Sequence, residues 1–414
     1  MRRVISFVIA LAMFTVTAAG IHVYDHRQAV TDSKAFGVWT SRDKFSAPEI
    51  MRSNITDRTL MIMGSSELTH KSDTLAHPVN FFDETDCDPL LIGAGYTQSL
   101  FHAINVAAIG DSLKDRRVIL IVSPSWFKKS GVVDVAYASR FSESEFTEML
   151  KNDNISDASK TYMIERTNKM LQSADPAGYK RVLSSEKIIY ADKADNIADD
   201  PVVSAACQPS LSDRINFRIY NAFNKERALY KMSFSSLLNT DLSVPPTHPD
   251  QTIYNTSGDI DWSALHDDIL TRSASSHNNQ FYMDPDGYRK ISHIVSHKKN
   301  KNKDPSVNCY ASSPEYGDFK CFLQVCNELG IEVNVFLLPL NGYWYDYMGY
   351  GPQTRSVFRQ NIADITAEYG ARLTDFSAYD FTKYFFEDGV HLDEEGWLTL
   401  DEKIYEYFNE NKEK

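Results

Sequence analysis

Short, strand-like apolar runs recur along the chain and are separated by longer segments with a different period. The first run, residues 60–63, is continuous and does not alternate between apolar and polar residues, which is typical of a strand buried on both faces of a parallel sheet. The runs are residues 60–63, 118–122, 333–338 and the weaker 373–376. The pattern therefore predicts several buried strands of a mainly parallel sheet.

Apolar residues recur at steps of three and four in other segments, as they do on the buried face of a helix. The clearest examples are residues 98–113, 314–329, 355–369 and 395–408. Strands that alternate with helices predict an α/β fold in which helices cover both faces of the sheet.

The region at about 130–300 breaks this alternation. It contains polar helical patterns at residues 142–151, 160–173 and 214–238, and then a turn-rich stretch with Pro245, Pro246 and Pro249. A basic run at residues 298–303 follows, which we interpret as a solvated loop. Because strand-like runs resume after it, we predict a largely helical insertion within one domain of residues 45–414.

The N-terminal segment is apolar enough to enter a membrane. Two arginines precede an uncharged stretch from Val4 to about Ile21, and about 18 such residues just suffice to span a bilayer as a helix. The positive charge before the stretch predicts an N-terminus inside and a body outside. We therefore predict a single-pass anchor at residues 1–24 and an extracellular body, with a signal peptide cleaved near residues 17–19 as the alternative.

Composition narrows the classes of function. A net charge of −13 over 414 residues argues against a nucleic-acid partner, because proteins that bind polyanions normally carry a basic face. The apolar content of 43% is that of a globular protein. The five cysteines have no spacing typical of a zinc site, so we expect no metal and no cofactor. Cys321 and Cys326, on one predicted helix, are expected to be buried thiols.

The first apolar run ends abruptly in Gly64, Ser65, Ser66 and Glu67. In open α/β sheets, ligands bind just beyond the carboxyl ends of the strands, where these residues would lie. Taken alone, the same residues are more typical of an ordinary helix N-cap, because helix starts far outnumber nucleophiles.

A second polar group stands before the last predicted helix, where Asp388 precedes His391 by three residues. Local hydrogen bonding in a turn explains such a pair when it occurs alone. Together with Ser66, however, the pair completes the hydroxyl, imidazole and carboxylate of Ser-His-Asp catalysis. We predict Ser66 as the nucleophile, His391 as general base and then general acid, and Asp388 as the group that orients His391.

These two blocks resemble those of SGNH/GDSL hydrolases, which carry Gly-Asp-Ser in the first and Asp-x-x-His in the last. The chain is more similar still to the DltD family, through segments that follow the family order over nearly its whole length. They are GSSEL (64–68), GAGYTQSL (93–100), VSPSWF (122–127), SPEYGDF (313–319), PLNGYWYDYMG (339–349) and EDGVHLDEEGW (387–397).

The resemblance implies a three-layer SGNH-hydrolase-like fold and a membrane-anchored extracellular protein that helps to move D-alanine onto lipoteichoic acid. It implies a membrane-bound O-acyltransferase of the same pathway as partner and, indirectly, a D-alanyl carrier protein on the cytoplasmic side. We expect an acyltransferase in which Ser66 carries the D-alanyl group. A D-alanyl esterase or thioesterase, and a non-catalytic scaffold that presents teichoic acid to the acyltransferase, are the alternatives.

The chain departs from the wider superfamily at the groups that would stabilise an oxyanion. Ser65 replaces the aspartate of Gly-Asp-Ser, as in the DltD family, and no Gly-x-Asn-Asp block follows the second apolar run. The similar position is Ser125, whose hydroxyl reaches less far than an amide. The backbone N–H groups of Ser66 and of the turn that contains Gly95 are therefore the better oxyanion-hole candidates, although such glycines also occur in ordinary strand-to-helix turns.

Three side chains are candidates for substrate binding. Glu67 could bind the D-alanyl ammonium group, and a helix cap is the alternative role. Tyr343 and Trp344 follow the third apolar run and are expected at the edge of the site, with core packing as the equally good alternative.

Overall fold

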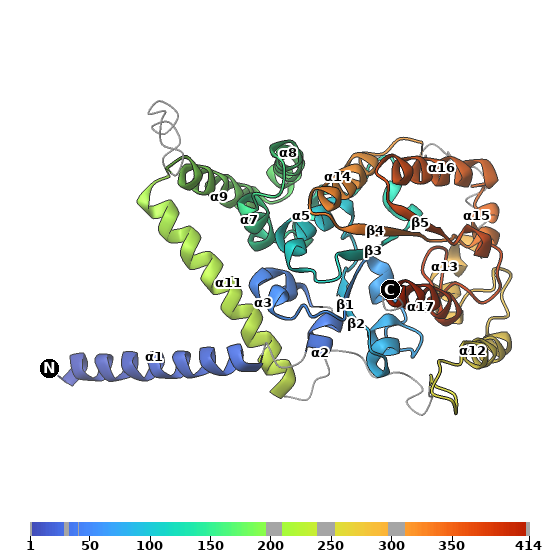
Figure 1. Ribbon diagram of the computed structural model, residues 1–414, viewed down its shortest axis with the longest axis horizontal. Helices are drawn as coiled ribbons and strands as arrows, with labels where there is room; N and C mark the ends of the chain where they lie inside the picture. The colour runs from blue at the N-terminus through green and yellow to red at the C-terminus, as the bar shows by residue number, and fades with distance from the viewer. Residues whose placement is uncertain are drawn as a thin grey trace.

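Five parallel strands form the centre of the computed structural model, in the order β2-β1-β3-β4-β5 (Figure 1). The strands are β1 (Thr59–Met63), β2 (Asp88–Ile92), β3 (Arg117–Val122), β4 (Glu332–Leu337) and β5 (Arg372–Asp375). The structure describes residues 2–28, 33–39, 41–195, 209–237, 253–296 and 311–410. The predicted α/β fold with a parallel sheet is confirmed, and it is consistent with an SGNH-like fold.

The strand order places a topological switch at β1. The chain leaves β1 for β2 on one side and later returns to β3 on the other. Ligand sites of open α/β sheets form at such a switch, beyond the carboxyl ends of the two diverging strands. The loop that starts at Gly64 lies there.

Four of the five strands were predicted from their apolar runs, and β2 was missed. This strand begins with Asp88 and Pro89 and has only three apolar residues after them, so it lacks the signal of a doubly buried strand. Proline is tolerated because β2 lies at the edge of the sheet, where one row of backbone groups needs no partner strand.

Each face of the sheet carries its own apolar core, because successive side chains of a strand point to opposite faces. Met61 and Met63 lie in one core with residues of α5 (Ser99–Ile109) and α14 (Glu315–Glu328). Leu60 and Ile62 lie in the other core with residues of α17 (Glu394–Asn409). The sheet is therefore the middle layer of three.

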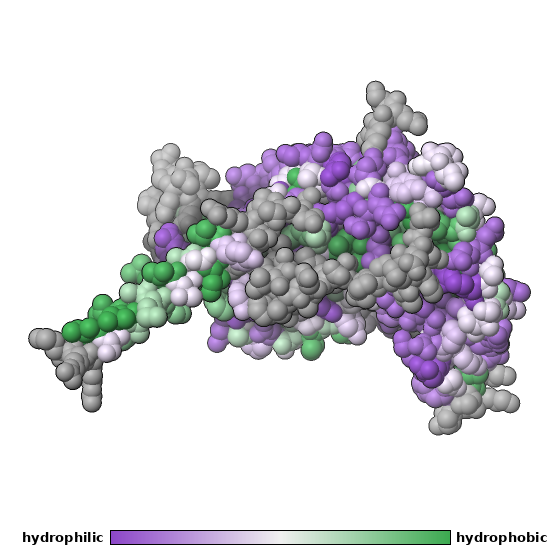
Figure 2. All heavy atoms as spheres, turned by 90° about the horizontal axis from the view of Figure 1, so that it is seen from below, coloured by the Kyte–Doolittle hydropathy of each residue, from purple (hydrophilic) through white to green (hydrophobic). Residues whose placement is uncertain are grey.

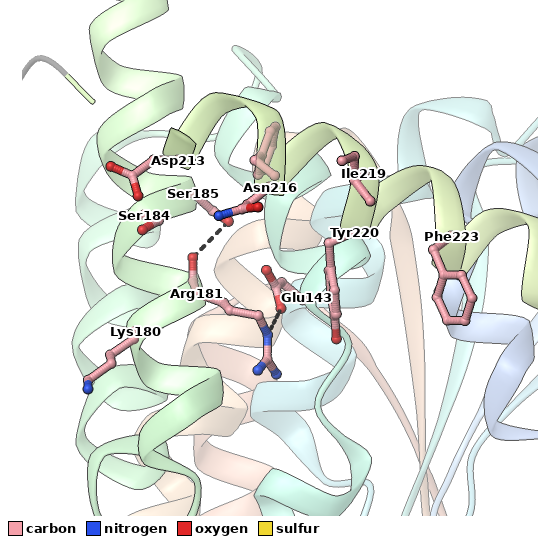
Figure 3. A pocket seen from close by; sticks show the side chains of 11 residues that line it. Glu143, Lys180, Arg181, Ser184, Ser185, Asp213, Asn216, Ile219, Tyr220 and Phe223 are labelled. Carbon is pink, nitrogen blue, oxygen red and sulfur yellow. Dashed lines mark hydrogen bonds and ion pairs between the residues drawn. The ribbon is translucent and has the colours of Figure 1, made fainter. Parts of the chain in front are cut away.

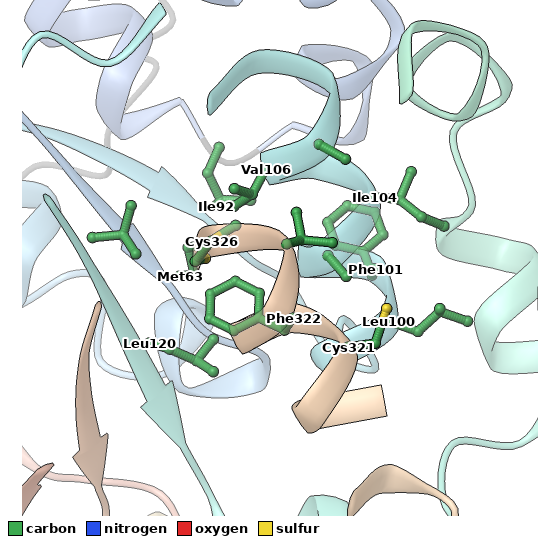
Figure 4. Packing of buried hydrophobic residues seen from close by; sticks show 14 of the residues in the cluster. Met63, Ile92, Leu100, Phe101, Ile104, Val106, Leu120, Cys321, Phe322 and Cys326 are labelled. Atoms are coloured by element: carbon green, nitrogen blue, oxygen red, sulfur yellow. The ribbon is translucent and has the colours of Figure 1, made fainter. Parts of the chain in front are cut away.

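Figure 4 shows how α5 and α14 close the first core. Phe322 and Cys326 of α14 lie against Met63 and Leu120, and Phe101 of α5 lies close to them. Phe322 is fully buried, and burial of a side chain of this size stabilises the fold by roughly 1.5–3 kcal/mol. Both predicted helices are confirmed within two residues at their starts, and α5 ends four residues before its predicted end.

The remaining helices surround these layers. Before β1 come α2 (Ser33–Val38) and α3 (Pro48–Ser53), and between β1 and β2 lies α4 (Pro78–Phe81). After β4 come α15 (Gly342–Tyr347) and α16 (Pro352–Glu368). Between β3 and β4 lie α6 (Asp134–Arg140), α7 (Glu143–Lys151), α8 (Asp157–Ala174), α9 (Pro176–Asp195), α11 (Leu211–Leu237), α12 (Trp262–Ser276) and α13 (Pro285–Ser296).

The three helices predicted between β3 and β4 are present as α7, α8 and α11, each starting within three residues of its predicted start. The proline-rich stretch at 245–249 and the basic run at 298–303 lie outside the described residues. Cys321 and Cys326 are buried and free, as predicted, and so is Cys87. Burial raises the pKa of the Cys326 thiol, so it stays protonated and unreactive.

Helix α1 (Arg2–Gln28) projects from the body, which it contacts through α11 near its C-terminal end (Figures 1 and 2). Its stretch Val4–Tyr24 is long and apolar enough to cross a membrane, and none of it is buried against the body. These 21 residues rise about 32 Å at 1.5 Å per residue, which matches a hydrocarbon core of about 30 Å. The helix fits a single-pass membrane anchor.

Candidate active site

The loop after β1 is held by the carbonyl oxygen of Gly64. This oxygen accepts hydrogen bonds from Thr97 Oγ1 at 2.8 Å and from His102 Nε2 at 2.9 Å. Burial lowers the pKa of His102 to about 3, so the ring is neutral and its Nε2–H donates. The Gly64 N–H donates to Ile92 at 3.0 Å. Side chains from the β2–α5 segment thus fix where β1 releases Ser65 and Ser66.

Gly93 permits this arrangement because it has no side chain. A methyl group at Gly93 would lie 2.4 Å from the Gly64 oxygen. We expect Gly93→Ala to displace the loop and to destabilise the fold by about 1–3 kcal/mol, as overpacked substitutions do. Thermal unfolding of the full chain in detergent measures this. Gly351→Ala is the matched control, since nothing lies within 4 Å of that position, and equal melting of both variants would contradict the prediction.

Ser66, His391 and Asp388 are in direct contact, although 325 residues separate the serine from the histidine. Ser66 Oγ lies 2.8 Å from His391 Nε2, and His391 Nδ1 lies 2.8 Å from Asp388 Oδ2. Ser66 opens the short helix η2 (Ser66–Thr69), directly after β1. The structure thus brings the three predicted catalytic residues into the geometry of a hydroxyl, a base and an orienting carboxylate.

The protonation states follow from the contacts. Burial raises the pKa of Asp388, but the hydrogen bond and charge of His391 outweigh it and hold the pKa at about 2. Burial lowers the pKa of His391, and the hydrogen bond and charge of Asp388 again outweigh it and raise the pKa above 6.5. In neutral His391 the proton therefore sits on Nδ1 and faces Asp388. Nε2 is left to accept the hydrogen of the Ser66 hydroxyl.

The loop that carries Asp388 and His391 is rigidly held. Asp388 Oδ1 accepts the N–H groups of Val390 and His391 at 2.8 and 2.9 Å, and the Glu387 N–H donates to the His391 carbonyl at 2.9 Å. The start of α13 packs against the same loop, because a methyl group at Gly287 would lie 1.8 Å from the Glu387 oxygen. A helix between β3 and β4 therefore supports the candidate catalytic loop directly.

The half-buried ammonium group of Lys71 links the loop after β1 to the segment that follows His391. Lys71 Nζ lies 2.8 Å from Asp284 Oδ2 and 3.0 Å from Asp393 Oδ1, and His277 Nε2 lies 2.6 Å from Asp393 Oδ2. Burial lowers the pKa of Lys71, but Asp393 and Asp284 outweigh it and raise the pKa above its usual value. His277, Asp284 and Asp393 are close enough to hold a metal ion. However, Lys71 already supplies a cation to both carboxylates.

His70 is a site residue that the sequence did not reveal. Its ring stacks on that of His391, with centroids 3.6 Å apart and planes 4° from parallel. His70 Nδ1 lies 2.6 Å from Glu387 Oε2, so a second histidine–carboxylate pair runs beside the first. Its position four residues after Ser66, in the loop after β1, was the available signal. His70, Asp388 and His391 could also hold a metal ion by distance, but His391 already bonds to Ser66 and Asp388.

Gly95 lies beside Ser66, as the oxyanion-hole prediction requires. A methyl group at Gly95 would lie 3.9 Å from Ser66 Cβ and 3.9 Å from Arg140 Nη2. The N–H groups of Gly95 and Ser66 make no hydrogen bond within the described part of the chain. Ser125 differs, because its hydroxyl bonds to Ser123 Oγ at 2.9 Å and to no triad residue.

Arg140, the last residue of α6, brings a positive charge to this edge of the site. Its Nε donates to the Gly95 carbonyl at 2.7 Å. No carboxylate pairs with its guanidinium among the residues that the structure describes. An anionic group of a substrate that reached Ser66 would therefore meet an uncompensated arginine.

The three substrate-binding candidates have different surroundings. Glu67 is buried and accepts the Ser65 N–H at 2.7 Å, and burial raises its pKa. These contacts agree with a local structural role for Glu67. Trp344 is half-buried on α15 and contacts the catalytic loop, since a methyl group at Gly389 would lie 2.7 Å from its ring. Tyr343, also half-buried, donates its hydroxyl to the Phe381 carbonyl at 3.0 Å.

A cavity of about 500 Å³ lies away from the triad, between α7, α9 and α11 (Figure 3). Phe217, Tyr220 and Phe223 of α11 line it, together with the ion pair between Glu143 and Arg181 at 2.9 Å. No residue of the triad contributes to it. It is a feature of the helices between β3 and β4, not of the candidate catalytic site.

Comparison with known proteins identifies the family of the chain. The family model described as "DltD protein" matches residues 37–409. The chain is 30% identical to Protein DltD of Bacillus subtilis (strain 168) over 357 residues, which cover 85% of this chain and 83% of the relative. It is 25% identical to Protein DltD of Staphylococcus aureus (strain NCTC 8325 / PS 47) over 346 residues, 83% of this chain and 79% of the relative. It is 23% identical to Protein DltD of Lacticaseibacillus rhamnosus over 357 residues, 84% and 77% of the two chains. The chain therefore belongs to the DltD family, a family of teichoic acid D-alanylation.

Proposed function

We propose that the protein transfers D-alanine onto lipoteichoic acid outside the membrane, through an acyl intermediate on Ser66. One observation carries the proposal: Ser66 Oγ, His391 and Asp388 are linked by two contacts of 2.8 Å in a chain of the DltD family. A scaffold without turnover would need no hydroxyl aligned on a base whose tautomer is fixed by a carboxylate.

In the first half of the reaction, Ser66 Oγ attacks the carbonyl carbon of an activated D-alanyl group. His391 Nε2 takes the hydroxyl proton. It then gives this proton to the leaving group as the bond between the D-alanyl carbonyl carbon and that group breaks. The imidazolium that forms is stabilised by ionised Asp388. The N–H groups of Ser66 and Gly95 are the donors available for the oxyanion.

In the second half, a glycerol hydroxyl of the polymer attacks the acyl carbon of D-alanyl-Ser66. His391 removes the proton of that hydroxyl and returns it to Ser66 Oγ when the acyl bond breaks. The products are a D-alanyl ester on the polymer and a free Ser66. Entry of water in place of the glycerol hydroxyl would give the esterase reaction, so acceptor binding decides between the two outcomes.

Arg140 is placed to bind the acceptor rather than the donor. The D-alanyl group carries an ammonium, which a guanidinium repels, whereas the polymer carries a phosphodiester next to its glycerol hydroxyls. An arginine binds phosphate oxygens through two parallel N–H bonds. In this proposal the guanidinium near Gly95 holds a phosphodiester while the neighbouring hydroxyl approaches Ser66.

The proposed localisation of the body is inferred from α1, which fits a membrane anchor. If α1 crosses the membrane with its N-terminus inside, the body and Ser66 face the extracellular polymer. The immediate donor would then come from the membrane-bound O-acyltransferase of the pathway. The D-alanyl carrier protein would contribute only from the cytoplasmic side.

A fluorophosphonate probe tests whether Ser66 is an activated nucleophile. We expect the full-length chain in detergent to be labelled on Ser66 in the wild type and in Ser65→Ala, and to lose labelling in Ser66→Ala. Ser65→Ala is the matched control because Ser65 is buried and its hydroxyl donates to the Ala94 carbonyl at 3.2 Å. Wild-type protein that stays unlabelled would contradict the nucleophile.

Substitution of Arg140 tests whether this residue binds the phosphate group of the acceptor. We expect Arg140→Gln to lower transfer to glycerol phosphate by about 10-fold or more, since a charge-assisted bidentate contact contributes roughly 1.5–3 kcal/mol. Transfer to uncharged glycerol and labelling of Ser66 by fluorophosphonate should change little. An equal loss with both acceptors would show that Arg140 supports the loop at Gly95 and does not bind phosphate.

A further inference from the structure

Helix α11 carries a stripe of apolar side chains that are largely exposed. Leu211, Ile215, Ile219 and Phe223 follow one another at steps of four, and Tyr230 continues the same side. Leu211 is 73% exposed, and Ile219 and Phe223 are each 63% exposed. Contiguous apolar surface of this kind on a polar body marks a contact site.

The other side of α11 is packed. Ala228 is buried in the apolar core, and Phe217 and Tyr220 line the cavity beside α9 (Figure 3). Ile219 and Phe223 of the stripe also contribute to the lining of this cavity, but each stays largely exposed. The stripe is therefore not a core face left open by chance. It is the outward side of a helix whose inward side already has its contacts.

An ion pair shows which way the stripe faces. His22 Nδ1 of α1 lies 2.7 Å from Glu226 Oε1 of α11, and the two helices pack against each other there. Glu226 follows Phe223 by three residues and Ile219 by seven, so it lies within the stripe on the helical surface. The stripe therefore points to the side from which α1 projects.

The position of α1, which is able to span a membrane, indicates that lipid lies on that side. His22 is near the end of the stretch Val4–Tyr24, which is the part of α1 able to cross a bilayer. Figure 1 shows α11 running across this end of α1 and leaning back toward the side from which α1 projects. From Glu226 to Leu211 the helix advances about 22 Å. That length of apolar face would lie along the lipid surface, with the modest tilt usual for spanning helices.

The charges of α11 suit a phospholipid surface. Arg218 is exposed at the border of the stripe, between Ile215 and Ile219. Amphipathic helices that lie in the membrane interface combine an apolar stripe with such basic residues. The net charge of −13 works against attraction of the whole body to anionic lipid, so burial of the apolar stripe must supply the main stabilisation.

We propose that α11 is an interfacial helix whose stripe, Leu211 to Phe223, inserts into the headgroup layer of the bilayer that α1 spans. The occupant is lipid, not a second protein. Together, α1 and α11 hold the body by two helices that cross, which fixes its rotation about α1. The orientation of the Ser66 site relative to the membrane is then set by the chain itself.

Spin labels on the full-length chain in vesicles of phosphatidylcholine and phosphatidylglycerol test this. One label is placed at Ile219→Cys, a second at Phe223→Cys, and the control at Val357→Cys. Val357 is an exposed residue of α16, which lies far from α1 (Figure 1). Cys207→Ser and Cys309→Ser are included in every variant, because the other three cysteines are buried.

We expect labels at Ile219 and Phe223 to collide several-fold more with oxygen, which concentrates in lipid, than with a water-soluble nickel chelate. The label at Val357 should show the opposite preference. Labels on α11 that behave as the Val357 label does would overturn the proposal. So would labels on α11 that become protected only when the membrane-bound O-acyltransferase is added, since the occupant would then be a protein.

Discussion

Ser66→Ala, His391→Ala and the double variant are each expected to reduce D-alanine esters on extracted teichoic acid to the same floor. All three remove the step in which Ser66 Oγ passes its proton to His391 across 2.8 Å. Residues that share one proton transfer are strongly non-additive, and single losses of roughly 10⁶-fold in kcat are typical. The measurement is D-alanine released by mild base from polymer of cells that carry each variant.

Ser65→Ala is the control for this series and should keep substantial esterification. Membrane fractionation of each variant shows that the protein is still present. If Ser66→Ala retained near-normal esterification, the covalent mechanism would fail and the scaffold alternative would remain. If Ser65→Ala fell to the same floor as Ser66→Ala, the assignment of the nucleophile would be unsafe.

Asp388→Asn is expected to lower transfer by roughly 10⁴-fold, the size of effect known for this change in a Ser-His-Asp triad. The amide removes the charge that fixes the proton on His391 Nδ1, although the imidazole stays in place. The pH profile changes as well. His391 must be neutral to act as base, and Asp388 raises its pKa above 6.5, so the wild-type rate should rise with pH through a midpoint above 6.5.

In Asp388→Asn this midpoint should move to lower pH, because burial lowers the pKa of His391 and the charge of Asp388, the largest that opposes it, is lost, while the smaller contributions of Glu67 and Glu387 remain. The rate of Ser66 labelling by fluorophosphonate, followed from pH 5 to 9, gives both midpoints. A structural role for Asp388 would lower the rate without moving the midpoint. An unchanged midpoint would therefore refute the assigned role.

Much of the fold follows from patterns that are local in sequence. Strands β1, β3 and β4 are buried on both faces over nearly their whole length, so their sequences are mostly apolar. β2 was missed because an edge strand tolerates Asp88 and Pro89. Helices with one apolar stripe, such as α14, were predicted with both ends within two residues of those in the structure. Short helices such as α3, with only six residues, have too little periodicity to be recognised.

The site residues also fall into two groups: those that the local sequence suggested and those that only the folded structure reveals. Ser66, Asp388 and His391 stand in turns next to strands and helices, where sequence alone could suggest their chemistry. His70 and Arg140 were not predicted, because their roles depend on a stacked ring whose centroid lies 3.6 Å away and on the carbonyl of Gly95. The ion pairs of Lys71 likewise join residues more than 200 positions apart. Such contacts exist only after the sheet has brought the loops together.

The central claim is that Ser66 carries D-alanine during transfer, and trapping the intermediate tests it most directly. The full-length chain would be incubated with its membrane-bound O-acyltransferase partner and an activated D-alanyl donor, without polymer, then quenched in acid and digested. Mass spectrometry should find one D-alanyl group on the peptide that contains Ser66, absent in Ser66→Ala and discharged when polymer is added first. A peptide that stays unmodified while the same mixture still esterifies polymer would contradict the account.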